Sequence, residues 1–223
     1  MTVRINKPAL NLREELTKAQ SVVPYVQQQF WMDGLVENGT FDTGTTNWDL
    51  LFNATASVVN GELEVTTTSG YGNVSQNIKT TIGNRYLVLG TVRAGTVNPR
   101  IEVYMANGGG TGVTSTSTTN QDLSFIFTST TETVNLQLKG QSSSTGTAYF
   151  DNVRLFEVDE NDNVIHSLPL GWKPLHVYED GLIQREGDVH DYTVVKTGGA
   201  YAIKPAVQPT ATTETCVIAE REL

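Results

Sequence analysis

Three histidines, His166, His176 and His190, are the side chains best suited to acid–base or metal chemistry, and all lie in the last third of the chain. His190 follows Asp188 by two residues and directly precedes Asp191, a grouping that could bind a metal ion or hold a catalytic base. No nucleophile motif such as Gly-x-Ser-x-Gly accompanies it. We therefore interpret the segment as a turn before a strand. Carboxylates are numerous, but no glycosidase signature surrounds any pair of them, and we expect no enzymatic activity.

The composition favours a β protein built from many short strands. The chain has 223 residues, of which 38% are hydrophobic and 17% charged, and it is rich in Gly, Thr, Ser and Asn. Polar turn residues at this frequency exclude a coiled coil or a long-helix bundle. The net charge of −9 argues against an unspecialised nucleic-acid binder, because phosphate contacts need clustered cations. Nor does any apolar run approach the roughly 20 residues of a membrane span.

Two further absences bear on the compartment. The single cysteine, Cys216, excludes an intrachain disulfide, and no Cys/His zinc pattern is present. The first residues do not combine a cationic stretch with an apolar one, so a secretory signal is not indicated.

Residues 33–158 show the pattern of a β-sandwich, in which apolar and polar residues alternate between turn signals. Asn60-Gly61 is a two-residue hairpin turn of the type that needs positive φ. Ile101, Val103 and Met105 should face the core, which turns Tyr104 outward. Residues 107–112 and 141–147 are too rich in Gly or Ser for strands and are predicted as loops. The other predicted strands cover residues 74–78, 86–93, 100–105, 121–127, 134–138 and 149–158.

Residues 1–32 differ from the rest and are predicted to form an anchoring arm with a short helix. Asn11 precedes Glu14 by three residues, as in a capping box. Leu12, Leu16 and Ala19 share one helical face. A helix of two to three turns does not hold alone in water, so this face should dock either on the chain's own β domain or on another subunit.

An acidic, turn-rich linker at residues 159–164 precedes a small β domain at residues 165–223. Asp180-Gly181 predicts a hairpin turn, and further strands are expected at residues 191–195, 200–204 and 215–221. The last of these strands is expected to leave an edge that a neighbouring copy could pair.

Two motifs of the sandwich region resemble the jelly-roll carbohydrate-binding modules of the xylan- and glucan-binding kind. Residues 37–42 (Glu-Asn-Gly-Thr-Phe-Asp) with Asn47-Trp48 are similar to the opening of that family, Asn-Gly-x-Phe-Glu followed by Gly-Trp. Residues 150–155 (Phe-Asp-Asn-Val-Arg-Leu) are similar to its last strand. The resemblance spans about 120 residues and implies a jelly roll, with Phe41 and Trp48 closing one end of the core.

In the resembling family a calcium ion is bound by the opening motif and the closing Asp, which implies Asp42 and Asp151 as ligands here. Two carboxylates on neighbouring strands repel each other unless a cation lies between them, and calcium prefers oxygen ligands. The alternative is that both aspartates cap turns. The family more often has Glu at the position of Asp42, whose reach is shorter.

Sugar binding requires aromatic faces for pyranose rings and amide or acid groups for hydroxyls. Tyr71, Asn73, Gln76 and Tyr104 are the candidates for such a site. For Tyr104, packing at a rim is the alternative to a ligand contact.

In the C-terminal region, Asp180-Gly181 is followed by Asp191-Tyr192-Thr193, a Pro-containing turn and a closing strand that ends in Arg221. In this order the region resembles a small β module that recurs in structural proteins of tailed bacteriophages. Residues 5–14 are also similar to the first residues of marine phage fibre and virion proteins. These resemblances imply a non-enzymatic protein of the virion surface, a capsid decoration or a head or tail fibre, whose partners are other virion proteins. Such proteins are commonly trimeric, and we expect a homotrimer. A carbohydrate-binding accessory module of a bacterial polysaccharide-degrading system is the alternative.

The predicted fold class is thus all-β: a jelly-roll β-sandwich with a short N-terminal helical arm and a small C-terminal β domain.

Overall fold

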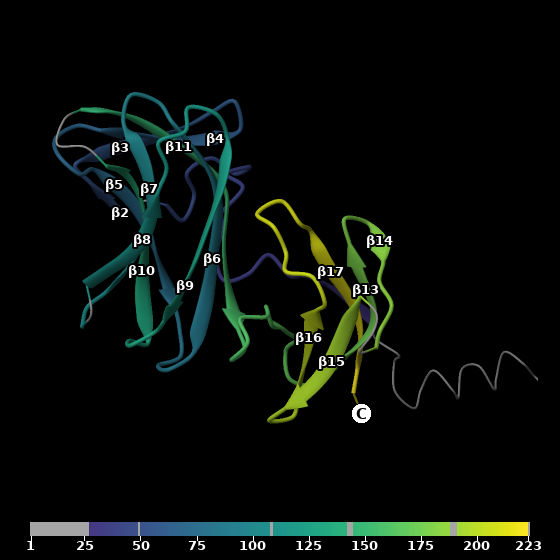
Figure 1. Ribbon diagram of the computed structural model, residues 1–223. Helices are drawn as coiled ribbons and strands as arrows, with labels where there is room; N and C mark the ends of the chain where they lie inside the picture. The colour runs from purple at the N-terminus through teal and green to yellow at the C-terminus, as the bar shows by residue number, and fades with distance from the viewer. Residues whose placement is uncertain (1–26, 49, 108, 142–144, 188–190, 223) are drawn as a thin grey trace, which may run out of the picture.

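The computed structural model describes residues 27–48, 50–107, 109–141, 145–187 and 191–222 as two β units that lie side by side (Figure 1). The prediction of an all-β jelly roll is confirmed. The predicted helix with Leu12, Leu16 and Ala19 falls outside the described residues. Within the described ranges no helix has the length and apolar character needed to cross a membrane.

Two five-stranded antiparallel sheets form the sandwich. The first sheet has the order β2 (Leu50–Phe52), β5 (Asn73–Lys79), β10 (Thr133–Gln141), β7 (Asn98–Met105) and β8 (Gly109–Thr114). The second sheet has the order β3 (Ala54–Val59), β4 (Glu62–Thr67), β11 (Gly146–Val158), β6 (Arg85–Ala94) and β9 (Gln121–Thr128).

Alternation along these strands builds the core between the sheets. On β7, Ile101, Val103 and Met105 are buried while Tyr104 is 47% exposed, as the sequence predicts. Phe41 and Trp48 are both buried, with ring centroids 5.7 Å apart, so their predicted place in the core is confirmed. The segment between these two rings consists of turns and contains no strand.

The glycine-rich segment predicted as a loop is partly a strand, β8, and that part of the prediction is wrong. β8 pairs with β7, placing Gly110 opposite Tyr104 and Gly112 opposite Glu102. A Cβ atom at Gly110 would collide with the Glu102 carboxylate, and one at Gly112 would collide with the backbone of β7. Glycine in a strand often marks such a close approach. The glycines that argued against a strand are therefore needed here, because β7 and the Glu102 side chain leave no room for a Cβ atom.

A β-bulge in β11 decides which side chains of this strand face outward. Asp151 pairs with Thr91 and Arg154 with Leu89, so β11 carries one extra residue there, and Asn152 has φ +50°. An extra residue reverses the alternation of the strand. Arg154 consequently lies on the outer side of the second sheet instead of in the sandwich core.

The C-terminal unit also has two sheets. One has the order β1 (Gln27–Trp31), β17 (Thr215–Arg221), β13 (Trp172–Glu179) and β14 (Leu182–Ile183), and the other has the order β12 (His166–Ser167), β16 (Ala200–Pro205) and β15 (Tyr192–Thr197).

Two predictions about this unit are wrong. Residues 27–31 do not belong to a separate arm, because they pair as β1 with β17, and Phe30 packs edge-on against Trp172 at 5.2 Å. The closing strand β17 offers no free edge, because β1 and β13 flank it on both sides. Packing of the partly buried Phe30 and the buried Met32 with Trp172 explains why this segment joins the C-terminal unit.

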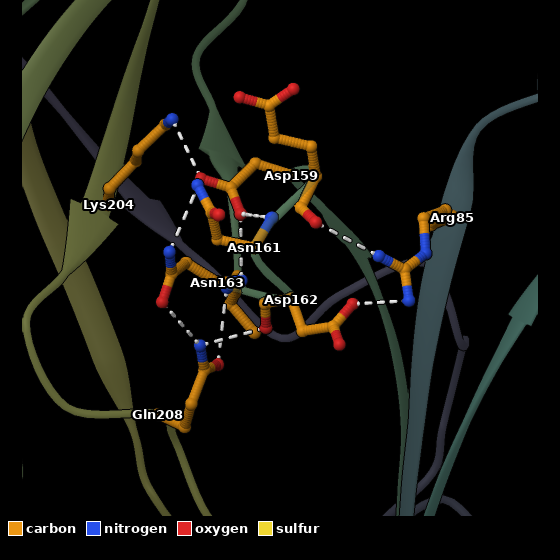
Figure 2. Close-up of polar contacts among 9 residues, drawn as sticks. Arg85, Asp159, Asn161, Asp162, Asn163, Lys204 and Gln208 are labelled. Atoms are coloured by element: carbon orange, nitrogen blue, oxygen red, sulfur yellow. Dashed lines mark hydrogen bonds and ion pairs between the residues drawn. The ribbon is translucent and has the colours of Figure 1, made fainter.

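Residues 159–164, expected as a linker, form polar contacts with both units (Figure 2). We call this set of residues the clasp: Asp159, Asp162, Asn163, Arg85, Lys204 and Gln208. Arg85 Nη2 lies 2.6 Å from Asp162 Oδ1, and Lys204 Nζ donates to Asp159 Oδ2 at 2.9 Å.

Apolar packing supports the clasp. Leu87, Leu89, Phe156 and Val158, on the outer side of the second sheet, are buried together with Val164 and Ala211. These contacts restrain the two units relative to each other.

Candidate functional site

The outer face of the first sheet carries a dense set of polar side chains. Cross-strand partners in a sheet point to the same side, and the registers of β5, β10 and β7 define three rows. We call the surface formed by these rows the amide face: Asn77, Asn135 and Tyr104; Ser75, Gln137 and Glu102; Asn73, Lys139 and Arg100.

Hydrogen bonds order the amides of this face. Asn135 Nδ2 donates to Asn77 Oδ1 at 2.9 Å and to Ser75 Oγ at 3.1 Å. Gln137 Nε2 donates to Asn135 Oδ1 at 2.6 Å. These bonds fix the amides in one arrangement, and their exposed atoms remain available to hydroxyl groups of a ligand.

A charge cluster occupies the side of the amide face formed by β10 and β7. The Glu102 carboxylate forms ion pairs with Lys139 and, at 3.2 Å, with Arg100. Its side chain lies over Gly110, where any larger residue would displace it. Because Gly110 of β8 has no side chain, the Glu102 carboxylate and its two flanking cations can lie flat on the sheet.

Exposed aromatic rings mark two corners of this face. Tyr104 is 47% exposed, since its neighbour on β8 is Gly110, which has no side chain to cover the ring. Phe52, which the sequence analysis missed, is 60% exposed and pairs with Asn73. Three strand spacings and four residues separate the two rings, roughly 14 Å across the strands and 13 Å along them.

Tyr71 lies in the bend before β5, two residues before Asn73. It is 60% exposed and has φ +39°. Its backbone conformation is uncommon for a bulky residue. Phe52 and Asn73 therefore lie at one end of the face and Tyr104 at the other.

The structure gives Gln76 a different position from the other sugar-binding candidates. Its side chain is buried; Oε1 accepts from the backbone N–H of Glu37 at 2.9 Å, and Nε2 donates to the carbonyl oxygens of Glu37 and Asn47 at 2.9 and 3.2 Å. All of these bonds hold the opening segment against β5. Gln76 therefore stabilises the fold and does not belong to the amide face.

Asp42 and Asp151, the predicted calcium ligands, lie near each other on the opposite side of the sandwich. Burial raises the pKa of Asp151, and the charges of Glu62 and Asp42 raise it further, against a hydrogen bond from the Asn152 backbone. Asp42 Oδ2 accepts from Thr40 Oγ1 at 2.6 Å, and Asp151 Oδ1 accepts from the Asn152 N–H at 2.7 Å. Both the calcium and the turn-capping interpretations remain compatible with this geometry.

The histidines are dispersed. His166 is buried at the junction of the two units, where burial and then the charge of Arg154 lower its pKa to about 4. His176 lies exposed on β13, and His190 lies outside the described residues. Across the described ranges no group of three or more His, Cys, Asp or Glu side chains is placed to hold a metal ion.

Several solved structures are similar to the sandwich. A family 4 carbohydrate-binding module has 18% identity and a TM-score of 0.46, covering 55% of this chain and 99% of that one. A family 16 carbohydrate-binding module has 18% identity and a TM-score of 0.41 at coverages of 55% and 99%.

The enzymatically active domain of tailspike protein 4 of bacteriophage CBA120 has 13% identity and a TM-score of 0.45, covering 56% of this chain and 21% of that one. No protein-family model and no curated protein matches the chain. At these identities and TM-scores, the comparisons support no conclusion about ligand or activity.

Proposed function

We propose that the protein is a non-enzymatic glycan-binding protein whose ligand lies across the amide face. The observation that carries this proposal is the exposed ring of Tyr104 beside a row of ordered amides and a paired carboxylate. Aromatic rings stack on the apolar faces of sugar rings, while amide and acid groups exchange hydrogen bonds with hydroxyls.

The layout of the face supports an extended ligand. Phe52 at one end and Tyr104 at the other leave the amides between them, with the Glu102 cluster beside Tyr104 along β7. A saccharide chain that runs diagonally across the strands would contact rings at both ends and polar groups in the middle. A single sugar would reach only one end, so we propose an oligosaccharide or polysaccharide.

Binding to a glycan array tests this proposal, with Tyr104→Ala as the decisive variant. Loss of one stacked ring removes about 0.5–1.5 kcal/mol beyond the loss of buried area, so affinity should fall roughly two- to tenfold. Leu182→Ala is the matched control, because it truncates an exposed apolar side chain on the C-terminal unit. If no glycan binds the wild-type chain, or Tyr104→Ala binds as tightly as Leu182→Ala, the proposal is wrong.

We further propose that the chain displays this face on the surface of a tailed-phage virion, as a capsid decoration or a head or tail fibre. The support is the resemblance of the C-terminal region and of residues 5–14 to phage structural proteins. Antibodies against the C-terminal unit should label purified particles in electron micrographs. Labelling of a secreted polysaccharide-degrading fraction and not of particles would instead favour the bacterial accessory module.

A further inference from the structure

A groove of about 690 Å³ opens where the segment after β1 passes between the sandwich and the C-terminal unit. The residues of its lining that matter here are Trp31, Asp33, Glu37, Asp42, Arg154 and Glu214. Arg154 lies on the outer side of the second sheet, whereas the amide face belongs to the first sheet. The groove is therefore distinct from the proposed glycan surface, and its volume is typical of a ligand site.

Arg154 is the buried cation of this groove. It is only 6% exposed, and the guanidinium donates through Nη1 to the carbonyl oxygen of Thr213. Within the described ranges it has no other hydrogen bond and no ion pair. Its remaining N–H groups thus lack a protein acceptor in those ranges and line an open groove, where water or a ligand can accept from them.

Burial lowers the pKa of Arg154, although the carboxylates of Asp33, Glu214 and Asp180 act in the opposite direction. These carboxylates are therefore near the guanidinium without contacting it. The β11 bulge places Arg154 in this position, and bulges commonly redirect a side chain toward a site.

Trp31 provides an aromatic wall. Its side chain is 57% exposed, whereas Trp48 and Trp172 are 1% and 8% exposed. It is the last residue of β1, a strand held in place by pairing with β17. A large indole on a fixed strand beside a groove is a preformed stacking surface.

The charges select the class of ligand. Four carboxylates, those of Asp33, Glu37, Asp42 and Glu214, surround the groove and would repel an anion. These carboxylates outnumber the single guanidinium of Arg154, so the groove also attracts cations, but a cation could not accept hydrogen bonds from Arg154. A neutral polyhydroxylated molecule satisfies both, because its hydroxyls donate to carboxylates and accept from the guanidinium. The C–H face of its ring can lie on the indole.

We propose that this groove is a second binding site, for a neutral saccharide, in which Trp31 stacks on the sugar ring, Arg154 donates to its hydroxyls, and Asp33 and Glu214 accept from them. The site goes beyond the proposed function of the amide face and does not require it. A chain with both sites would hold one glycan at two points, or two glycans at once, which raises avidity on a dense glycan surface.

Acrylamide quenching of tryptophan fluorescence tests the site directly, because Trp31 is the exposed indole of the three. The probes are neutral oligosaccharides of glucose, xylose, mannose and galactose, with oligogalacturonate as the charged counterpart. At least one neutral probe should protect the fluorescence from quenching, and oligogalacturonate should not. Tyr104→Ala should leave this protection intact, which separates failure of the amide face from failure of the groove.

Variants then assign the contacts by calorimetry with the protective probe, measured in the Tyr104→Ala background. Trp31→Ala and Arg154→Met should each weaken binding at least tenfold, and Glu214→Gln severalfold, while Glu160→Gln, an exposed carboxylate outside the groove, should have no effect. Thermal unfolding of each variant controls for folding, and Glu214→Gln tests the site even if Arg154→Met fails to fold.

Three results would overturn the proposal. The first is that Trp31 is already shielded without saccharide, because the groove would then be occupied by the protein itself. The second is protection by oligogalacturonate alone. The third is unchanged affinity in folded Trp31→Ala and Glu214→Gln.

Discussion

The clasp between the two units makes a quantitative prediction about acid sensitivity. Asp159 follows β11, and its carboxylate accepts from Lys204 on β16 and from the backbone N–H groups of Asn161 and Asn163, each at 2.9 Å. Burial opposes the charged form, but the hydrogen bonds of Lys204, Asn163 and Asn161 outweigh it and lower the pKa of Asp159 to about 2. The perturbation is Asp159→Asn, which keeps the size of the side chain and removes its charge.

The magnitude follows from linkage. Lowering the pKa from its ordinary value of 3.8 to about 2 corresponds to roughly 2.5 kcal/mol of folding free energy. The carboxylate borders solvent, which screens the interaction, so we expect Asp159→Asn to cost roughly 1–1.5 kcal/mol at neutral pH. A depressed carboxyl pKa contributes stability above the unfolded-state pKa, and that contribution disappears as pH falls from about 5 to about 2.

Urea unfolding followed by tryptophan fluorescence, repeated between neutral pH and pH of about 2, measures this effect. The difference in free energy of unfolding between the wild type and Asp159→Asn should shrink steadily over that interval. Lys204→Met should reproduce most of the loss, and the double variant should be less than additive, because both changes remove one interaction. Glu160→Gln is the matched control: its side chain is exposed, and only its backbone carbonyl contacts Arg85.

A cost below roughly 0.3 kcal/mol for Asp159→Asn at neutral pH would refute this account. So would a difference between wild type and variant that does not change with pH. Additive losses in Asp159→Asn and Lys204→Met would show that the ion pair does not couple the units.

Four further predictions follow from other parts of the molecule. If calcium lies between Asp42 and Asp151, chelator should lower the melting temperature of the wild type and leave that of Asp151→Ala unchanged, since bound cation stabilises by mass action; an unchanged wild-type curve would leave only turn capping. Removal of residues 1–20 should leave the sandwich folded, convert the homotrimer expected from the sequence to monomer in light scattering and abolish incorporation into the particle; normal incorporation would contradict the anchoring role of this segment. Gly110→Val should displace the Glu102 carboxylate and reduce glycan binding at least tenfold on the array; Gly44→Val, where a Cβ meets nothing within 4 Å and only the backbone is strained at φ +73°, is the surface control. Gln76→Leu should destabilise the chain by about 1–3 kcal/mol in urea unfolding, because it leaves backbone groups of Glu37 and Asn47 without partners; a cost near zero would show that these bonds are replaced by water.

Local patterns in the sequence determine much of the sandwich. Alternation places Tyr104 outside and its neighbours inside, and the pairs Asn60-Gly61 and Asp180-Gly181 form turns with positive φ at all four residues. These features depend on side chains within a few positions of each other, so they can be read from one segment at a time.

Contacts between distant segments decided what the sequence did not show. From the sequence the glycines of β8 look like loop residues. The structure shows why they are needed, because Glu102 of the neighbouring strand lies over Gly110. From the sequence Gln76 resembles a ligand-binding residue, but in the structure its amide is hydrogen-bonded to the backbone of Glu37, 39 positions away. From the sequence the residues of β1 look like part of an arm, but they pair with β17, which lies almost 190 residues later in the chain.

The same reason explains why the sequence did not reveal the groove. An extra residue in β11 reverses the alternation of the strand and moves Arg154 from the core side to the outside. Only then does Arg154 line one groove with Trp31, from a strand of the other unit, and with Glu214 near the C-terminus. The sequence by itself determined strands, turns and the outward tyrosine, because these depend on local periodicity. The tertiary structure alone decided which polar groups meet, because register and bulges are set by packing between strands that are far apart in the chain.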